Sequence, residues 1–253
     1  MEILLYTIIF IIGCFFGSFF TLAVYRIPRK EDILIKHSYC PNCNHKLGFL
    51  DLFPVFSYIF LLGKCRYCKN KIRSRYLILE IFSGITFLLY AISIKLNIYN
   101  INFFEIVMIY IYISVLFIIA GIDKENFKIE KNVLIFGFFI EFIYIIYQCI
   151  SNEFDIYKYV MYLVVMIILL LISIIVLKTK KRLLYNIQLL FLSFYIIIFT
   201  GSIIYILSVI MTLLVIAFYQ INSKKEKTPV GFFLCTSNII TIIITNLICS
   251  YLI

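Results

Sequence analysis

Four cysteines in two closely spaced pairs are the residues of this chain best suited to chemistry. They are Cys40 and Cys43, separated by Pro-Asn, and Cys65 and Cys68, separated by Arg-Tyr. Two thiolates two residues apart can bind one metal ion from a tight turn, and a second such pair completes a tetrahedral set. A redox disulfide, or four unrelated cysteines, is the alternative that one pair would leave open. Two pairs favour a thiophilic metal, and zinc is the usual ion.

The metal is expected to hold the loop folded, because a closed set of four thiolates leaves no open position for a substrate. The other four cysteines are single residues in apolar runs and are predicted to act as small hydrophobic side chains. They are Cys14, Cys149, Cys235 and Cys249.

The elements that must position the paired cysteines are membrane helices. The 253 residues are 64% hydrophobic and 14% charged, and the mean hydropathy is +1.06. Polytopic membrane proteins have such a composition, and soluble globular domains do not. The formal net charge of +10 would fit a nucleic-acid partner, but the basic residues gather in short loops between apolar runs. This placement argues against nucleic acid and makes membrane lipid the expected partner.

The apolar runs predict eight transmembrane helices, since one crossing needs about 20 residues. The run 183–221 has about twice that length and is expected to break at Thr200-Gly201-Ser202. Pro229 stands at a favourable position for starting the last helix. The predicted spans are 3–25, 76–95, 103–122, 132–150, 157–177, two within 183–221, and 230–253.

The basic residues predict the orientation of these spans. The loops 26–75, 123–131, 178–182 and 222–228 hold 21 of the 23 Lys and Arg. The positive-inside rule places these loops in the cytoplasm and both termini outside. The reducing cytoplasm favours metal over disulfide for the four loop cysteines. The predicted class is an all-α polytopic protein of the cell membrane, with eight transmembrane helices and a cytoplasmic four-cysteine zinc-binding loop.

Two features of the first third predict contacts. Gly13 and Gly17 lie on one face of the first helix with Ser18 beside them, which favours close packing against another helix. The apolar segment 47–62 is too short to span a bilayer and contains Pro54. We expect it to be interfacial or re-entrant, on the face of the bilayer.

Carboxylates in or near the spans are further candidates, because ionisable groups at membrane depth are functional candidates by default. Asp123 follows Ala-Gly-Ile at the end of the third span. An ordinary helix-end residue is the alternative for a lone aspartate, and it applies to Glu80 and Glu105 as well. Glu141 lies well inside its predicted span, where a carboxylate needs a partner or a proton. The sequence names neither.

Six stretches of the chain follow the pattern of a known family. They are Gly17-Ser18-Phe19 through Tyr25-Arg26-Ile27-Pro28, Ser38-Tyr39-Cys40-Pro41-Asn42-Cys43, Asp51-Leu52-Phe53-Pro54-Val55, Gly63-Lys64-Cys65-Arg66-Tyr67-Cys68, Ser74-Arg75-Tyr76 with Glu80, and Pro229-Val230-Gly231. They resemble the motifs of the prepilin peptidases, membrane aspartic endopeptidases that remove leaders from type IV pilins and related pseudopilins. The resemblance covers most of the chain and is densest before residue 85, and Thr21 stands where the family's pattern has Asn.

The resemblance implies two catalytic aspartates at the cytoplasmic ends of two helices, one activating water and one protonating the departing amine. Asp123 matches the first. In the family's G-x-G-D-x-K-L motif, Asn186 takes the place of the second aspartate, Tyr185 that of the second glycine and Gln188 that of the lysine. An amide cannot exchange the proton, so the chain is predicted to cleave peptides weakly or not at all. The isosteric Asn favours an engineered variant, whereas the missing Gly and Lys favour natural drift.

The resemblance also implies substrates and a second activity. The substrates are type IV prepilins or pseudopilins, and the second activity is methylation of the new N-terminus with S-adenosylmethionine. No glycine-rich nucleotide loop marks a site for that cofactor. The predicted domains are 1–75, the first transmembrane helix with the zinc loop, and 76–253, a seven-helix aspartic peptidase core.

Two other functions stay open. A degenerate peptidase that binds pilin precursors or assembly partners without cutting them would be a membrane scaffold. A small transporter with a zinc-stapled loop is the third hypothesis. The few polar residues in the spans and the lack of an evident repeat between the halves argue against transport.

Overall fold

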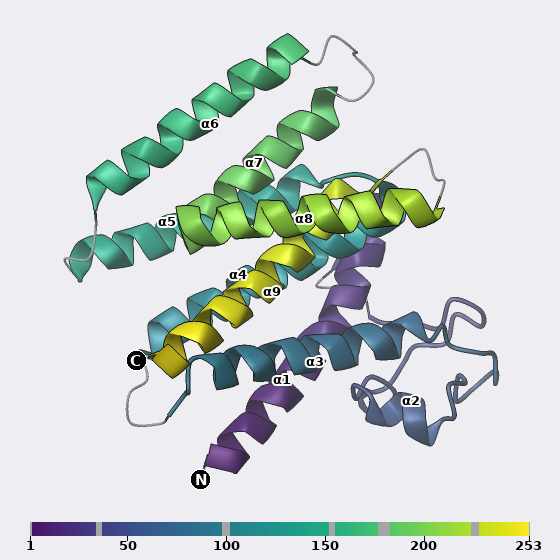
Figure 1. Cartoon of the computed structure of the whole chain (residues 1–253). Helices are drawn as coiled ribbons and strands as arrows, with labels where there is room; N and C mark the ends of the chain where they lie inside the picture. The colour runs from purple at the N-terminus through teal and green to yellow at the C-terminus, as the bar shows by residue number, and fades with distance from the viewer. Residues whose placement is uncertain are drawn as a thin grey trace. The chain divides into compact units, whose positions relative to one another are not determined.

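Helices make up nearly all the regular structure of the described residues. The computed structural model describes residues 2–33, 37–97, 102–151, 155–176, 183–223 and 228–252 (Figure 1). Within these ranges the β pairing consists of two isolated antiparallel bridges, both in the cysteine loop. The predicted all-α class is confirmed for the described residues.

Each of the eight predicted spans forms a helix. These helices are α1 (Glu2–Arg26), α3 (Arg75–Ser93), α4 (Phe103–Asn126), α5 (Lys131–Ile150), α6 (Ile156–Val176), α7 (Leu183–Thr200), α8 (Ser202–Ser223) and α9 (Val230–Leu252). Among the described residues, six helices are long and apolar enough to cross a membrane, while the apolar stretches found in α6 and α7 are shorter. The structure thus supports a membrane protein with six candidate spans, and the count of eight stays a prediction.

The long apolar run breaks where the sequence predicts. Gly201 separates α7 from α8 and has a φ of +84°, which L side chains rarely adopt. Its N–H donates to the Ile197 carbonyl at 2.9 Å, closing the last turn of α7. The glycine therefore ends one helix and lets the next begin at once.

The structure forms two compact units, one of Met1–Ile101 with Asn246–Ile253 and one of Asn102–Thr245. The domains predicted from the sequence, 1–75 and 76–253, are defined by expected function: a zinc loop with its helix, and a peptidase core. That division stays a prediction.

In the first unit, α1 and α3 cross each other (Figure 1), and glycines line their contact. A Cβ added to Gly13 would lie 2.8 Å from the Gly84 Cα, and one added to Gly17 would lie 2.7 Å from the Glu80 Cα. Real Cβ atoms do not come so close, so the two backbones touch where these side chains are absent. Small residues allow such close approach between membrane helices, and the predicted glycine face is confirmed.

The loop between α1 and α3 starts from a buried arginine. Arg26 ends α1 and donates from Nη1 to the Asp32 carbonyl at 2.9 Å and from Nη2 to the His37 carbonyl at 3.1 Å. A guanidinium has five N–H donors in a fixed fork, so it can hold several loop carbonyls at once. Arg26 therefore fixes how the chain leaves the helix.

Glu80 of α3 binds the same loop. The Val55 N–H donates to Glu80 Oε2 at 2.8 Å, and Val55 has a φ of 63°, which is strained for a β-branched residue. The Phe56 N–H donates to the Pro54 carbonyl at 2.6 Å, so Val55 is the centre of a tight three-residue turn. The short helices η2 (Phe49–Asp51) and α2 (Phe56–Phe60) flank it. The structure thus shows how the predicted interfacial segment 47–62 folds locally. Its contact with a bilayer stays a prediction.

The core of the second unit is aromatic and aliphatic. Tyr112 of α4 stacks on Phe199 of α7 with ring centroids 4.2 Å apart, and it lies 5.2 Å from the Tyr195 ring. The largest fully buried side chains of this unit are Tyr112, Ile113, Leu116, Ile119, Ile122, Ile129, Glu141, Leu192, Tyr195 and Ile196. This packing fixes the end of α4, where Asp123 lies.

Candidate metal centre and candidate active site

The four loop cysteines come together in the first unit. Their Sγ atoms all lie within 4.8 Å of one another, and those of Cys40 and Cys68 are 3.9 Å apart. Zinc–sulfur bonds of about 2.3 Å, arranged as a tetrahedron, place the sulfurs about 3.8 Å apart. The donor set therefore fits a zinc ion.

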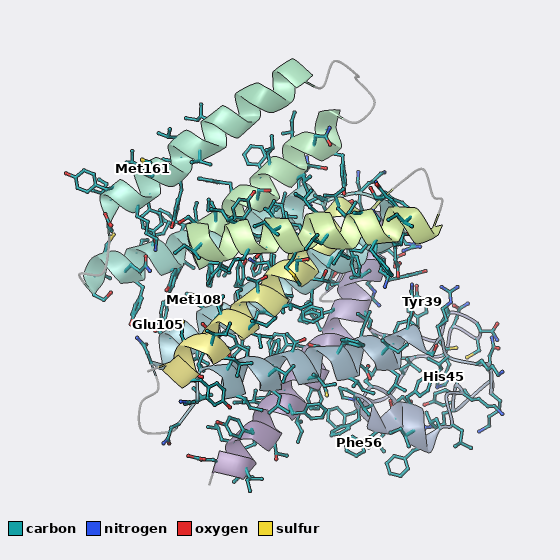
Figure 2. All side chains as sticks on the ribbon, in the orientation of Figure 1. Tyr39, His45, Phe56, Glu105, Met108 and Met161 are labelled. Carbon is teal, nitrogen blue, oxygen red and sulfur yellow. The ribbon has the colours of Figure 1, made fainter. Side chains whose placement is uncertain are left out.

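Two turns of the same design carry the cysteines. In each, the N–H of the first cysteine donates to the carbonyl five residues later, and the N–H following the second cysteine donates to the carbonyl of the first. An antiparallel bridge closes each turn, between Tyr39 and Lys46 in the first and between Lys64 and Lys71 in the second. Figure 2 labels Tyr39 and His45 of the first turn. Asn44 and Lys69, which follow the second cysteines, have left-handed φ values of 55° and 58°. The backbone thus presents both thiol pairs in the same way.

Side chains connect one turn to the other. The His45 and Tyr67 rings lie 3.6 Å apart, and the Asn42 side-chain amide donates to Cys68 Sγ at 3.7 Å. A backbone hydrogen bond from Asn70, aided by the Asn42 amide, lowers the pKa of Cys68 to about 6. Thiolate is the form that binds metal, so the surroundings of Cys68 already favour the liganding state.

Asp51 joins the second turn to the segment before it. Its carboxylate accepts hydrogen bonds from Arg66 Nε at 2.6 Å, the Gly48 N–H at 3.1 Å and the Tyr67 hydroxyl at 3.2 Å. Partial burial raises its pKa, but the Arg66 and Gly48 hydrogen bonds outweigh burial and hold the pKa below its usual value. The sequence places Asp51 in a motif without a role, and the structure gives it this structural one.

Asp123 lies in the last turn of α4 and is 0% exposed. Its Oδ2 atom accepts a hydrogen bond from the Phe232 N–H at 2.9 Å and one from the Tyr185 hydroxyl at 3.1 Å. Its Oδ1 atom is buried without a hydrogen-bond partner. The carboxylate is therefore held through one oxygen, and the other is left for a proton or a further donor.

The start of α9 is shaped to receive Asp123. Phe232 is the third residue of α9, so its N–H is one of the donors that a helix start leaves without an intrahelical partner. Helix starts also carry partial positive charge, which favours a carboxylate. A Cβ on Gly231 would lie 3.0 Å from Asp123 Oδ2, so the glycine gives the carboxylate room. The Pro229-Val230-Gly231 motif thus begins a helix that binds Asp123.

The partner that α7 supplies to Asp123 is Tyr185, and Asn186 is not among the hydrogen-bond partners found for it. The Tyr185 hydroxyl accepts from the Gly231 N–H at 3.2 Å while donating to Asp123. Asn186 is the next residue along α7 and is half-buried. Sequence reasoning noted Tyr185 as the replacement of a glycine but missed this contact. A phenol among aliphatic residues in the first turn of an apolar helix was the available signal, since a buried hydroxyl requires a partner.

Three other acidic residues of the second unit have different surroundings. Asp155 caps α6, since its Oδ1 accepts hydrogen bonds from the N–H groups of Tyr157 and Lys158 at 3.0 and 3.4 Å. Glu105 lies in the first turn of α4 (Figure 2) and is half-buried. Glu141 is 1% exposed, as expected from its place in the sequence. None of the three is found bonded to Asp123.

Comparison with known proteins gives a family match in the first part of the chain. The family model described as Bacterial Peptidase A24 N-terminal domain matches residues 11–94, a range that includes the four paired cysteines. No solved structure matches the chain.

Curated relatives share the same printed name, "Prepilin leader peptidase/N-methyltransferase". The protein of Vibrio cholerae serotype O1 is 40% identical over 98 residues, which are 35% of this chain and 39% of that protein. The protein of Bacillus subtilis is 32% identical over 130 residues, 51% of this chain and 50% of that protein. The protein of Klebsiella pneumoniae is 31% identical over 87 residues, 32% of this chain and 38% of that protein.

The chain spans half or less of the length of each of these relatives. The family match nevertheless includes all four paired cysteines, and the structure brings their sulfur atoms together. Residues 11–94 thus resemble the Bacterial Peptidase A24 N-terminal domain, and parts of this chain are similar to proteins named as prepilin leader peptidase/N-methyltransferases.

Proposed function

We propose that this chain processes type IV prepilin-like proteins by removing their leader peptide at the cytoplasmic face of the cell membrane. The observation that carries the proposal is the buried Asp123 carboxylate, fixed through Oδ2 while Oδ1 has no partner. A carboxylate oriented in this way can take a proton from a water molecule that attacks a peptide carbonyl. The name printed for the relatives supports the choice of substrate.

The proposal includes weak hydrolysis, because a second carboxylic acid is missing. The departing amine needs a proton, and the Asn186 amide cannot supply one. Tyr185 donates to Asp123, but a phenol with an ordinary pKa of about 10 is a far weaker acid than a carboxyl group. We assign Tyr185 the role of holding Asp123, not that of the second acid.

The cysteine cluster has a structural role in this proposal. Cys40, Cys43, Cys65 and Cys68 would hold zinc, and a bound zinc ion would cross-link the two turns. Methylation of the new N-terminus with S-adenosylmethionine is the second proposed activity, supported by the word "N-methyltransferase" in the names of the relatives. We assign no residue to the methyl donor.

The test is cleavage of a cognate prepilin by the full chain in membranes, compared among variants at position 186. We expect Asn186→Asp to raise the cleavage rate by about 10²-fold or more, the usual contribution of one acid–base group. Because Tyr185 occupies the place of the family's glycine, the double variant Tyr185→Gly/Asn186→Asp is measured alongside. Asn186→Ala is the matched control and should give no gain.

The same assay identifies the role of Asp123. Asp123→Asn should abolish cleavage when it is combined with either the single variant Asn186→Asp or the double variant. The carboxylate assigned to activate water is then missing, and the one acid introduced at position 186 cannot both activate water and protonate the departing amine. Failure of both the single and the double variant to cut a prepilin that they bind would refute the peptidase proposal.

A non-catalytic scaffold is the second candidate, and the contact of Asp123 with α9 favours it. A carboxylate that caps a helix start has a structural use without any reaction. In that case prepilin binding is unchanged by Asp123→Asn, and no variant at position 186 cleaves.

A further inference from the structure

Glu141 lies inside the second unit and takes no part in the Asp123 site. It stands near the middle of α5, one of the six candidate membrane spans, and is 1% exposed. Its Oε1 atom is buried without a hydrogen-bond partner. An ionised carboxylate in such a place is costly unless it is paired, so Glu141 requires either a cation or a proton.

The titratable groups that face Glu141 are neutral at pH 7. Tyr112 of α4, Tyr159 of α6 and Tyr195 of α7 each interact with it electrostatically. Cys235 of α9 interacts electrostatically with Tyr112 and Tyr195. No Lys, Arg or His of the described chain is found interacting with the Glu141 carboxyl group. A cationic side chain therefore does not neutralise it in the described structure.

Packing places Tyr195 beside the same face of α5. A Cβ on Gly137, one turn before Glu141, would lie 3.1 Å from the Tyr195 ring. Residues four apart share one face of a helix, so Glu141 and the tyrosine ring occupy neighbouring positions. The Tyr195 hydroxyl is also buried without a hydrogen-bond partner.

A satisfied hydrogen-bond chain lies next to these two atoms. Tyr112, whose ring is 5.2 Å from that of Tyr195, donates through its hydroxyl to Asn238 Oδ1 at 2.7 Å. The Asn238 amide donates to the Ser208 hydroxyl at 3.0 Å. The polar groups of this chain thus have partners, while the Glu141 and Tyr195 oxygens beside them lack one.

We propose that Glu141 is a proton-binding site in the membrane interior and that one buried water joins its carboxyl group to the Tyr195 hydroxyl. A protonated carboxyl group carries no charge and both donates and accepts hydrogen bonds. A water molecule supplies the partner that each of the two oxygens lacks, as buried waters commonly do. A metal cation fits less well, because hard cations require six or more oxygen ligands and this site offers one carboxylate among neutral hydroxyls.

The test is infrared spectroscopy of the full chain in lipid nanodiscs at pH 7, where exposed carboxylates are ionised. We expect the C=O stretching band of a protonated carboxyl group, shifted by ¹³C-glutamate labelling and lost in Glu141→Gln. Glu80→Gln and Glu105→Gln are the matched controls and should keep the band. The ¹³C-glutamate label separates the signal from that of Asp123 without any variant, so the test holds even if Glu141→Gln folds poorly.

The bridging water has its own measurement. Tyr195→Phe removes the hydroxyl and should move the Glu141 band to higher frequency, since the carboxyl group loses part of its hydrogen bonding. An unmoved band would overturn the water bridge.

Three results would overturn the proton site: no glutamate band at pH 7, a band that survives Glu141→Gln, or loss of the band when sodium is added. The third result would show a cation site in place of a proton site. Glu141 lies outside the Asp123 contacts, so the outcome is independent of whether the chain cleaves prepilins.

Discussion

The cysteine loop and the Asp123 site assemble their chemistry in opposite ways. The loop takes all four donor atoms from residues 40–68, and two turns with the same hydrogen bonds present them. The Asp123 site draws on α4, α7 and α9, with partners 62 and 109 residues away in the chain. The loop gathers the four thiols that a tetrahedral metal site needs, whereas in the proposed Asp123 site Asn186 stands where the resemblance to prepilin peptidases predicts a second acid.

This difference shows which kind of site tolerates change. A site built from one short segment needs its donor atoms and its local turns, so its presence can be recognised from spacing alone. A site assembled from three helices depends on how each helix is rotated. The observed contacts of Asp123 come from Tyr185 and the start of α9, so they do not depend on a particular side chain at position 186.

The largest effect is expected from removing one ligand of the complete site. Cys65→Ser should lower the bound zinc of the purified full chain from about one ion per chain to a small fraction, because three thiolates no longer close the tetrahedron. Metal content measured by mass spectrometry checks this, with limited proteolysis of the loop as a second readout. Cys149→Ser and Cys249→Ser, at exposed single cysteines, should keep the metal. Equal zinc content in all three variants would mean that the cluster is not the metal site.

A smaller effect is expected from truncating the carboxylate of the assembled site. Asp123→Ala leaves the Phe232 N–H and the Tyr185 hydroxyl without an acceptor, at a cost of about 1–3 kcal/mol of stability. Asp123→Asn should cost less than half as much, because its side-chain oxygen can still accept. Thermal unfolding followed by circular dichroism measures both. Equal losses would show that charge, not hydrogen-bond acceptance, joins α4 to α9.

Tyr185→Phe should have a weaker effect still, of about 1 kcal/mol, because a single hydroxyl is removed and the ring stays. The same unfolding measurement applies. The Asn186→Ala variant is the neighbouring control and should change stability less, since no contact between Asn186 and Asp123 is found. If the order of the two variants were reversed, the assignment of the α7 partner to Tyr185 would be wrong.

The smallest effect is expected at the ion pair that braces the loop. Asp51→Asn weakens the contact with Arg66, whose side chain is 46% exposed. A solvent-exposed partner keeps such an ion pair weak, so the change should speed loop proteolysis only slightly at pH 7. The difference from the unmodified chain should be fully present at neutral pH and should shrink as the pH falls through the lowered pKa of Asp51, because protonation removes the charge that Arg66 pairs with. A difference that grows on acidification would contradict this account.

Much of the fold could be predicted because its signals are local. The apolar runs predict all eight helices, the Thr200-Gly201-Ser202 turn follows from the length of one run, and cysteine spacing predicts the cluster. Gly13 and Gly17 indicate a packing face, but the residues that they meet could not be read from the sequence. Helix count across the bilayer and orientation stay predictions.

The candidate active site was less accessible, for a geometric reason. A shift of one residue turns a side chain by about 100° around a helix, so motif alignment at Asn186 gives no account of where Tyr185 points. The hydrogen bond between Asp123 and the start of α9 joins residues 109 positions apart, and no local pattern predicts such a pairing. The same holds for Glu141, whose depth was predicted but whose neighbour Tyr195 was not.

The matching turns of the cysteine loop have a kinetic consequence. Each of the two turns would bind the metal ion through two cysteines. When the ion leaves one turn, the other turn still holds it. The chain between the turns keeps the free cysteines close, at an effective concentration of about millimolar. Recapture is then faster than escape, so spontaneous release requires both turns to open in the same interval. A competing chelator that displaces the turns one after the other provides the faster route, and metal exchange at this site should accelerate with chelator concentration.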